Sequence, residues 1–198
     1  MSAAYTIRDA VPADAADLAI LDNVASHGFS QWFWQGAVIQ GKAEDAYAWG
    51  RSRFADRDAI FGWKNARVIA DENDIIAGAL NSYLMPDEEV ADEMSEPEEF
   101  RPVLQLFLRA AGDWFVDSLA VYPDCRGQGL GRMLLDDCIS RGQKAGHQTI
   151  SLVAEDANPP AIALYESRGF KTVEARPYIP FTKHSTSQNW LLMKAPLH

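Results

Sequence analysis

The chain has few of the residues that mark a disulfide-rich or metal-binding protein. Only two of its 198 residues are cysteine and four are histidine. Cys125 and Cys138 do not make a disulfide framework, and the scattered histidines give no metal-ligand spacing. We therefore expect reduced cysteines, a cytoplasmic protein and no bound metal.

Long apolar runs and an excess of positive charge are also missing. No apolar run reaches the length needed to cross a bilayer, and the first eight residues lack the pattern of a signal peptide. The net charge of −10 argues against nucleic acid or an anionic membrane surface as a partner. An acidic surface is compatible with a cationic amine substrate, or with solubility alone.

What the chain does contain is enough apolar sequence for a folded core. Apolar residues make up 47% of the chain, so we expect one domain spanning residues 1–198. Periodicity and turn residues predict strands at 5–8, 67–70, 75–84, 116–121, 148–154, 170–177 and 189–194. They predict helices at 9–28, 43–55, 98–109, 130–142 and 159–168, and leave the aromatic segment 30–40 open. This alternation predicts an α/β fold with a mixed sheet.

A strand, a glycine-rich loop and a helix follow one another between residues 116 and 139. The apolar strand leads into a loop in which Gly127, Gly129 and Gly131 alternate with other residues. Glycine lets the backbone approach an anion closely, and the first N–H groups of a helix have no acceptor within it. The helix dipole adds partial positive charge at the same place. The segment therefore predicts a phosphate-binding loop.

The glycine spacing differs from two common nucleotide-binding motifs. A P-loop requires Lys-Ser or Lys-Thr after its glycines, and a dinucleotide fingerprint requires Gly-x-Gly-x-x-Gly. The run from Arg126 to Gly131 instead resembles the acetyl-CoA pyrophosphate loop of the GNAT N-acetyltransferase superfamily, Arg/Gln-x-x-Gly-x-Gly/Ala. Residues 119–123, Leu-Ala-Val-Tyr-Pro, resemble the central strand of that family.

A second block resembles the same family independently. Residues 150–154 form an apolar, β-branched run, and Asn158 with two following prolines is typical of a turn and a helix start. The segment that follows carries Tyr165 and Gly169-Phe170. It is similar to the GNAT pattern Asn-x-x-Ala-x-x-Leu-Tyr-x-x-x-Gly-Phe.

The resemblance implies the GNAT fold, a mixed central sheet flanked by helices. Its element order is strand, two helices, three strands, helix, strand, helix and two strands. The acidic stretch 86–99 and the helix after it form an insertion at 86–110 relative to a minimal member. This insertion leaves the acceptor substrate open.

The resemblance also implies acetyl-CoA as co-substrate and a set of residues that bind it. The backbone of Leu119 and Val121 would pair with the pantetheine arm, and an N–H of Leu119 or Ala120 would face the thioester carbonyl. Asn158 would form a hydrogen bond with the same arm. Asparagine is also common in turns, so its presence here does not require a ligand. The full set is Leu119, Ala120, Val121, Arg126, Gly127, Gln128, Gly129, Leu130, Gly131, Arg132 and Asn158.

Two residues are candidates for proton transfer. Tyr165 would protonate the coenzyme A thiolate, because a phenol with a pKa of about 10 can donate to an alkyl thiolate; its alternative is a core aromatic. Asp117 lies within an apolar strand, where a carboxylate requires a partner, and would be the general base. The alternative is that Asp117 is a solvated carboxylate on the exposed face of the strand. His27 and His184 are further candidates for the base.

These features predict an N-acetyltransferase that transfers an acetyl group to a primary amine, with a small cationic amine favoured. The alternatives are a non-catalytic acyl-CoA sensor and a transferase for protein N-termini or lysines. The acceptor pocket would involve the segment 27–35, with Trp32, Phe33 and Trp34, and the segment 178–187. The three aromatic residues would serve as a substrate wall or cation cage, as helix packing, or as the surface of a homodimer.

Overall fold

The computed structural model describes residues 4–87, 96–182 and 185–198. The chain forms two compact units. Unit 1 comprises residues 4–83 and 117–138, and unit 2 comprises the described residues of 84–116 and 139–198. Both the strand Trp114–Val121 and the helix Leu130–Lys144 contribute residues to each unit.

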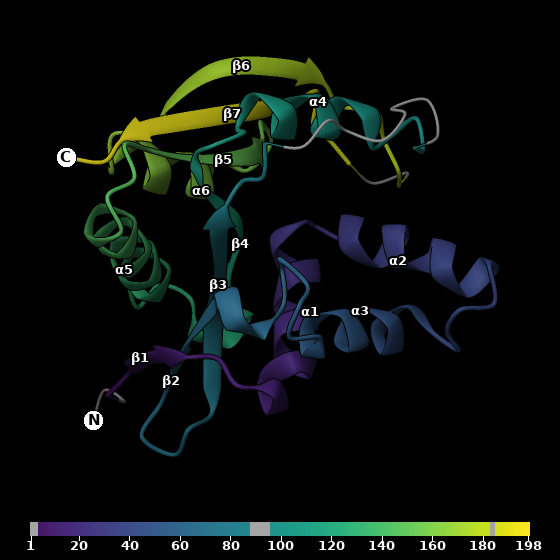
Figure 1. Ribbon diagram of the computed structural model, residues 1–198, viewed down its shortest axis with the longest axis horizontal. Helices are drawn as coiled ribbons and strands as arrows, with labels where there is room; N and C mark the ends of the chain where they lie inside the picture. Colours follow the sequence, from purple (N-terminus) through teal and green to yellow (C-terminus); the bar gives the residue numbers. More distant parts are fainter. Residues whose placement is uncertain (1–3, 88–95, 183–184) are drawn as a thin grey trace. The chain divides into compact units, whose positions relative to one another are not determined.

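Unit 1 combines an antiparallel part of the sheet with three helices (Figure 1). Strand β1 pairs antiparallel with β2, and β2 pairs antiparallel with β3. The backbone N–H of Tyr122, directly after β4, donates to Ala77 O of β3 at 2.8 Å. The elements of unit 1 are β1 (Thr6–Asp9), η1 (Pro12–Asp14), α1 (Ala15–Ala25), α2 (Phe29–Ile39), α3 (Ala46–Ala55), η2 (Trp63–Asn65), β2 (Ala66–Ala70), β3 (Ile76–Leu84), β4 (Trp114–Val121) from Asp117 onward, η4 (Pro123–Cys125) and α5 (Leu130–Lys144) as far as Cys138.

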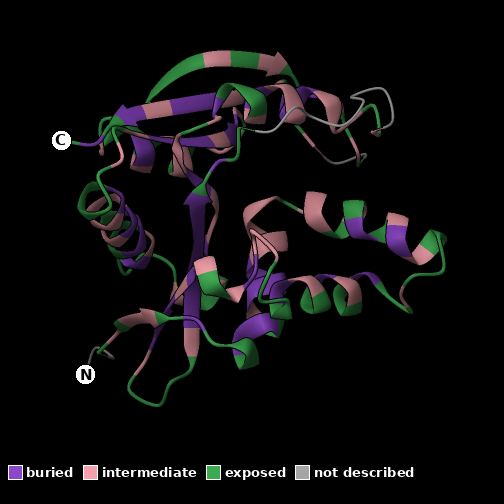
Figure 2. Ribbon diagram, viewed as in Figure 1, coloured by how far each residue is buried: buried purple, intermediate pink, exposed green. Residues whose placement is uncertain are grey.

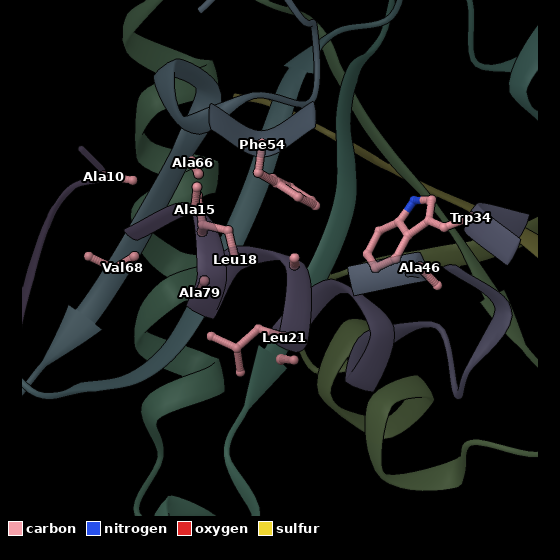
Figure 3. Packing of buried hydrophobic residues seen from close by; sticks show 12 residues of the cluster. Ala10, Ala15, Leu18, Leu21, Trp34, Ala46, Phe54, Ala66, Val68 and Ala79 are labelled. Atoms are coloured by element: carbon pink, nitrogen blue, oxygen red, sulfur yellow. The ribbon is translucent and has the colours of Figure 1, made fainter. Parts of the chain in front are cut away.

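The core of unit 1 lies where helices α1 and α3 meet strands β2 and β3 (Figure 3). Leu18 and Leu21 of α1 are three residues apart, so they share one face of the helix, and both are buried. Trp34 of α2 packs edge-on against Phe54 of α3, with ring centroids 6.4 Å apart. A Cβ at Gly50 would lie 2.5 Å from the Trp34 ring, so glycine at that position permits this close packing.

Unit 2 contains the parallel strand pair and the carboxyl-terminal hairpin. Strand β4 pairs in parallel with β5 from Trp114↔Ile150 to Val116↔Leu152. Strand β7 pairs antiparallel with both β5 and β6. Figure 2 shows β7 mostly buried and the edge strand β6 mostly exposed or intermediate. The elements are α4 (Arg101–Arg109), β4 up to Val116, α5 from Ile139, β5 (Thr149–Glu155), α6 (Pro159–Glu166), β6 (Lys171–Pro177) and β7 (Asn189–Pro196).

The predicted fold class is confirmed. The seven strands have the order β1-β2-β3-β4-β5-β7-β6 and mix parallel with antiparallel pairs. The open segment 30–40 is largely helical, and α3 is a third helix between the first two strands, one more than the resemblance implied. Helix α4 lies between β3 and β4, and residues 88–95 of the acidic stretch lie outside the described residues, so the insertion at 86–110 stays a prediction.

Periodicity predicts that Val103, Leu104, Phe107 and Leu108 form the apolar face of the helix at 98–109, and this prediction is partly wrong. Val103 is buried, but Leu108 is 40% exposed. Besides Pro102 in the first turn, the buried positions are Val103, Leu106 and Ala110, which follow a three- and four-residue spacing. That face packs in unit 2, where α4 contacts β5, β6 and β7.

Candidate active site

The glycine loop after β4 has a backbone conformation that favours glycine at two positions. Gly127 and Gly129 have φ values of +76° and +80°, in the left-handed region that favours glycine. No atom lies within 4 Å of a Cβ placed at either residue, so backbone conformation rather than crowding accounts for glycine there. The loop is tied together by Arg126 Nε, which donates to Val121 O at 3.1 Å. Gln128 Nε2 donates to Cys125 O at 3.3 Å.

The loop places the start of α5 at its end, with N–H groups that suit an anion. The N–H of Met133 donates to Gly129 O at 3.1 Å, so the N–H groups of residues 130–132 precede the first helical hydrogen bond. Gly129 and Arg132 are exposed. The N–H groups of a helix N-terminus and two exposed arginines, Arg126 and Arg132, fit a pyrophosphate group.

The strand before the loop is tightly packed against β3. Ala120 is buried, and Leu119 and Val121 are partly buried. A Cβ at Gly78 of β3 would lie 2.6 Å from Ala120 O, so glycine at position 78 permits the close approach of the two backbones. The hydrogen-bonding groups of Ala120 are thus next to β3 on one side of the strand.

Asp117 of β4 belongs to a cluster of polar side chains within unit 1. Tyr83 Oη of β3 donates to Asp117 Oδ1 at 2.9 Å. Burial, followed by the charge of Asp22 on α1, raises the pKa of Asp117 to about 7, against the smaller lowering effect of the Tyr83 hydrogen bond. Both aspartates keep part of their surface accessible. A carboxyl with this pKa titrates near neutrality, which suits a general base.

Asp22 is held by two serine hydroxyls. Ser30 Oγ of α2 donates to Asp22 Oδ2 at 2.6 Å, and Ser118 of β4 is also hydrogen-bonded to this carboxyl. Burial raises the pKa of Asp22, and both serine hydrogen bonds counteract that rise. The pair Asp22 and Asp117 therefore consists of two carboxyls in one poorly solvated place.

Sequence reasoning identified Asp117 but missed Asp22, Ser30 and Tyr83. One signal for Asp22 was present, because it follows Leu18 by four residues and so shares the buried face of α1. A carboxylate on an apolar helix face requires a partner. Tyr83 carried no comparable signal, since an aromatic residue is ordinary in a strand.

Asn158 and Tyr165 lie in unit 2, where local packing accounts for both. Asn158 Oδ1 accepts a hydrogen bond from Ala161 N at 3.4 Å and caps α6. Tyr165 is 9% exposed, and its ring lies 5.9 Å from that of Phe170. Burial raises the pKa of Tyr165 to about 12, so its phenol is protonated at neutral pH.

The aromatic residues of α2 have different environments. Trp34 is part of the core of unit 1, whereas Phe33 is 41% exposed and stacks on Phe29 at 6.4 Å between centroids. His27 is exposed in the turn after α1, and His184 lies outside the described residues. Trp34 therefore has the packing role that was one of the alternatives for this segment.

Within residues 4–87, 96–182 and 185–198, no three histidine, cysteine, aspartate or glutamate side chains are grouped as a metal ion would require. None of the helices in these ranges combines the length and the apolar character of a membrane span.

Local sequence similarity to curated proteins is concentrated in short segments. The [ribosomal protein bS18]-alanine N-acetyltransferase of Escherichia coli K12 is 46% identical over 66 residues, which are 33% of this chain and 45% of that protein. The mycothiol acetyltransferase of Propionibacterium freudenreichii subsp. shermanii is 40% identical over 65 residues, which are 33% of this chain and 20% of that protein. The alignments thus span less than half the length of these relatives.

Solved structures share the fold over nearly the whole chain. A GNAT superfamily phosphinothricin acetyltransferase from Sinorhizobium meliloti, in complex with AcCoA, matches with a TM-score of 0.63 at 22% identity, covering 98% of this chain and 88% of that chain. The ribosomal-protein-S18-alanine N-acetyltransferase from Escherichia coli matches with a TM-score of 0.60 at 19% identity, covering 98% and 94%. The model of the acetyltransferase (GNAT) family matches residues 27–170, well over half of the sequence. The chain belongs to the acetyltransferase (GNAT) family.

Proposed function

We propose that this chain is an acetyl-CoA-dependent N-acetyltransferase that acetylates a primary amine by direct attack on the thioester. The observation that carries the proposal is the combination of two features within unit 1. A glycine loop leads into the N-terminus of α5, and Asp117, a half-buried residue whose carboxyl has a raised pKa, lies on the strand before that loop. The loop suits a pyrophosphate, and the carboxyl suits the proton of an ammonium group.

The proposed roles of the unit 1 residues follow from these properties. The N–H groups of residues 130–132 and the side chains of Arg126 and Arg132 would bind the pyrophosphate. The backbone of Leu119 and Val121 would hold the pantetheine arm by strand-like hydrogen bonds, and an N–H of Leu119 or Ala120 would polarise the thioester carbonyl. Bound acetyl-CoA supplies the acetyl group as a thioester whose C–S bond breaks as the C–N bond forms.

Asp117 would remove the proton that makes the amine unreactive. An amine attacks only as its neutral form, and at neutral pH an alkyl amine is mostly protonated. A carboxyl with a pKa of about 7 is a stronger base than an ordinary aspartate and is partly ionised at that pH. The resemblance further supports Tyr165 as the group that returns a proton to the leaving thiolate, and its buried phenol carries that proton at neutral pH.

More than one class of amine is a candidate substrate for the proposed reaction. The carboxyls Asp22 and Asp117 and the net charge of −10 favour a small cationic amine. Relatives with local similarity are named for a ribosomal protein alanine and for mycothiol, so a protein N-terminus is the second candidate acceptor. A cytoplasmic location and a homodimer stay predictions of the sequence.

Acetyl-CoA-dependent thiol release tests this function directly. The acceptors would be polyamines, aminoglycosides, free amino acids and a peptide with an N-terminal alanine, each assayed with the wild type and with Asp117→Asn. We expect turnover on one amine class and a fall in kcat/KM of about 10² to 10⁴ in the variant, the usual effect of removing a general base. Asp58→Asn, an exposed aspartate of unit 1, is the matched control and should retain full activity.

The binding of acetyl-CoA separates the alternatives. Calorimetry that detects binding without acetylation of any amine would favour the non-catalytic sensor. The absence of binding would contradict the proposed function altogether.

A further inference from the structure

In the carboxyl cluster of unit 1, Asp22 accepts more hydrogen bonds than Asp117. Asp22 accepts from the hydroxyls of Ser30 and Ser118, whereas Asp117 accepts from Tyr83. A hydrogen bond to a carboxylate stabilises its charged form. Two donors on Asp22 against one on Asp117 therefore favour Asp22 as the charged member of the pair.

The hydroxyl on Asp22 is itself oriented by a second serine. Ser26 Oγ lies 2.9 Å from Ser30 Oγ, and Ser30 donates its only hydroxyl proton to Asp22 at 2.6 Å. Ser30 has no second hydroxyl proton, so it can only accept from Ser26, whose own hydroxyl also lies 3.4 Å from Asn23 O. The Ser30 N–H donates to Ser26 Oγ at 3.1 Å, so the turn between α1 and α2 holds Ser30 beside the Asp22 carboxylate.

The groups that face the pair come from each neighbouring element of unit 1. They are Tyr83 of β3, Ser30 of α2 and Ser118 of β4. Among the described residues, no lysine, arginine or histidine contributes to the pKa shift of either carboxyl. The groups that set these two pKa values therefore include no cation, and a protonated amine could supply one.

We propose that Asp22 is a positioning residue of the amine site: its negative charge makes Asp117 the member of the pair that binds and releases a proton, and attracts the ammonium group of a cationic substrate. This inference rests on the proposed function, in which Asp117 is the base. With the amine bound, the ionised form of Asp117 takes one proton from the ammonium nitrogen, whose lone pair then attacks the acetyl carbon and displaces the coenzyme A thiolate. The second proton lost by the nitrogen balances the one that the thiolate takes up. Asp22 stays ionised throughout and exchanges no proton.

Carboxyl NMR of protein labelled with ¹³C at aspartate tests the assignment without any assay of activity. Asp117→Asn would identify the signal that titrates near pH 7. Asp22→Asn should lower the midpoint of that signal by at least about one pH unit, because the neighbouring charge is removed while an oxygen remains to accept from the serines. Asp22→Glu should restore much of the midpoint, since it restores the charge.

Tyr83→Phe gives an independent measurement that leaves Asp22 intact. It removes the donor on Asp117, so the midpoint should rise rather than fall. Opposite shifts in the two variants would support the division of roles. An unchanged midpoint in Asp22→Asn, or loss of the signal near pH 7 from Asp22→Asn rather than from Asp117→Asn, would overturn it.

Kinetics on an accepted amine then test the effect on substrate. In Asp22→Asn the acidic limb of the pH profile of kcat/KM should move to lower pH together with the NMR midpoint, and KM for a cationic amine should rise about tenfold. Asp58→Asn should change neither. If no amine is acetylated while the NMR shifts occur as expected, the proposed function fails and the protonation of the pair stands.

Discussion

The polar residues singled out in the two units are stabilised in different ways. In unit 1, Asp22 and Asp117 share a poorly solvated place in which hydroxyls satisfy part of their hydrogen-bonding capacity and their charges oppose each other. In unit 2, Asn158 caps a helix and Tyr165 packs on Phe170, so ordinary structural roles account for both. Unfavourable charge placement is therefore a property of unit 1, and such placement more often accompanies function than a well-satisfied cap does.

Tyr165→Phe is the strongest test of the contrast between the two units, because it shows whether a residue of unit 2 also takes part in the reaction. If the phenol is the proton donor, kcat should fall by about 10²-fold, while the affinity for acetyl-CoA and the fold are retained. Steady-state rates at saturating donor and calorimetric binding would measure the two quantities. Tyr47→Phe removes an exposed phenol of α3 as a control. An unchanged kcat would leave Tyr165 with packing alone.

Gly129→Ala tests the loop of unit 1 through its backbone. A φ of +80° costs an alanine about 1–2 kcal/mol, so the loop should shift and the Kd for acetyl-CoA should rise about tenfold. Gly36→Ala is the matched control, because Gly36 lies within α2 without a positive φ and with open space around it. That change should stabilise the protein by about 0.5–1 kcal/mol and leave binding unaltered. Equal binding by both variants would argue against a phosphate-binding loop.

The pH dependence of stability tests the raised pKa of Asp117. Because the native state holds this proton up to about pH 7 and the unfolded chain releases it near pH 4, Asp117 lowers stability as the pH rises between these values. Asp117→Asn removes that contribution. Its Tm relative to the wild type should therefore increase from pH 4 to pH 8, measured by thermal denaturation. A constant difference in Tm would contradict the raised pKa.

Asn158→Ala should give the smallest effect, a loss of stability of about 1 kcal/mol from the missing cap of α6. For a chain of this length this corresponds to a fall in Tm of about 2–4 °C. Asn158→Ser retains a capping oxygen and should keep most of the stability. A weaker affinity for acetyl-CoA in both variants would show that Asn158 also binds the cofactor, and would narrow the contrast between the two units.

Local sequence features predicted much of the fold. The glycines of the loop, the prolines after Asn158 and the periodicity of the strands depend on the preferences of neighbouring residues, and the structure has its elements within a few positions of the predicted ones. The buried face of α4 could not be predicted from local sequence in the same way. A helix with several apolar residues has more than one candidate stripe, and contact with β5, β6 and β7 selects Leu106 over Leu108.

The sequence by itself determined the family and predicted a phosphate-binding loop, because both depend on a short continuous segment in which glycine spacing and helix start act locally. Only the tertiary structure decided that Trp34 is a core residue and that Asp117 has Asp22 and Tyr83 as neighbours. Tyr83 of β3 lies 34 positions from Asp117 in the sequence, and Asp22 of α1 lies 95 positions from it. The protonation of a carboxyl depends on its burial and on nearby charge, and both are set by which distant elements the fold brings together.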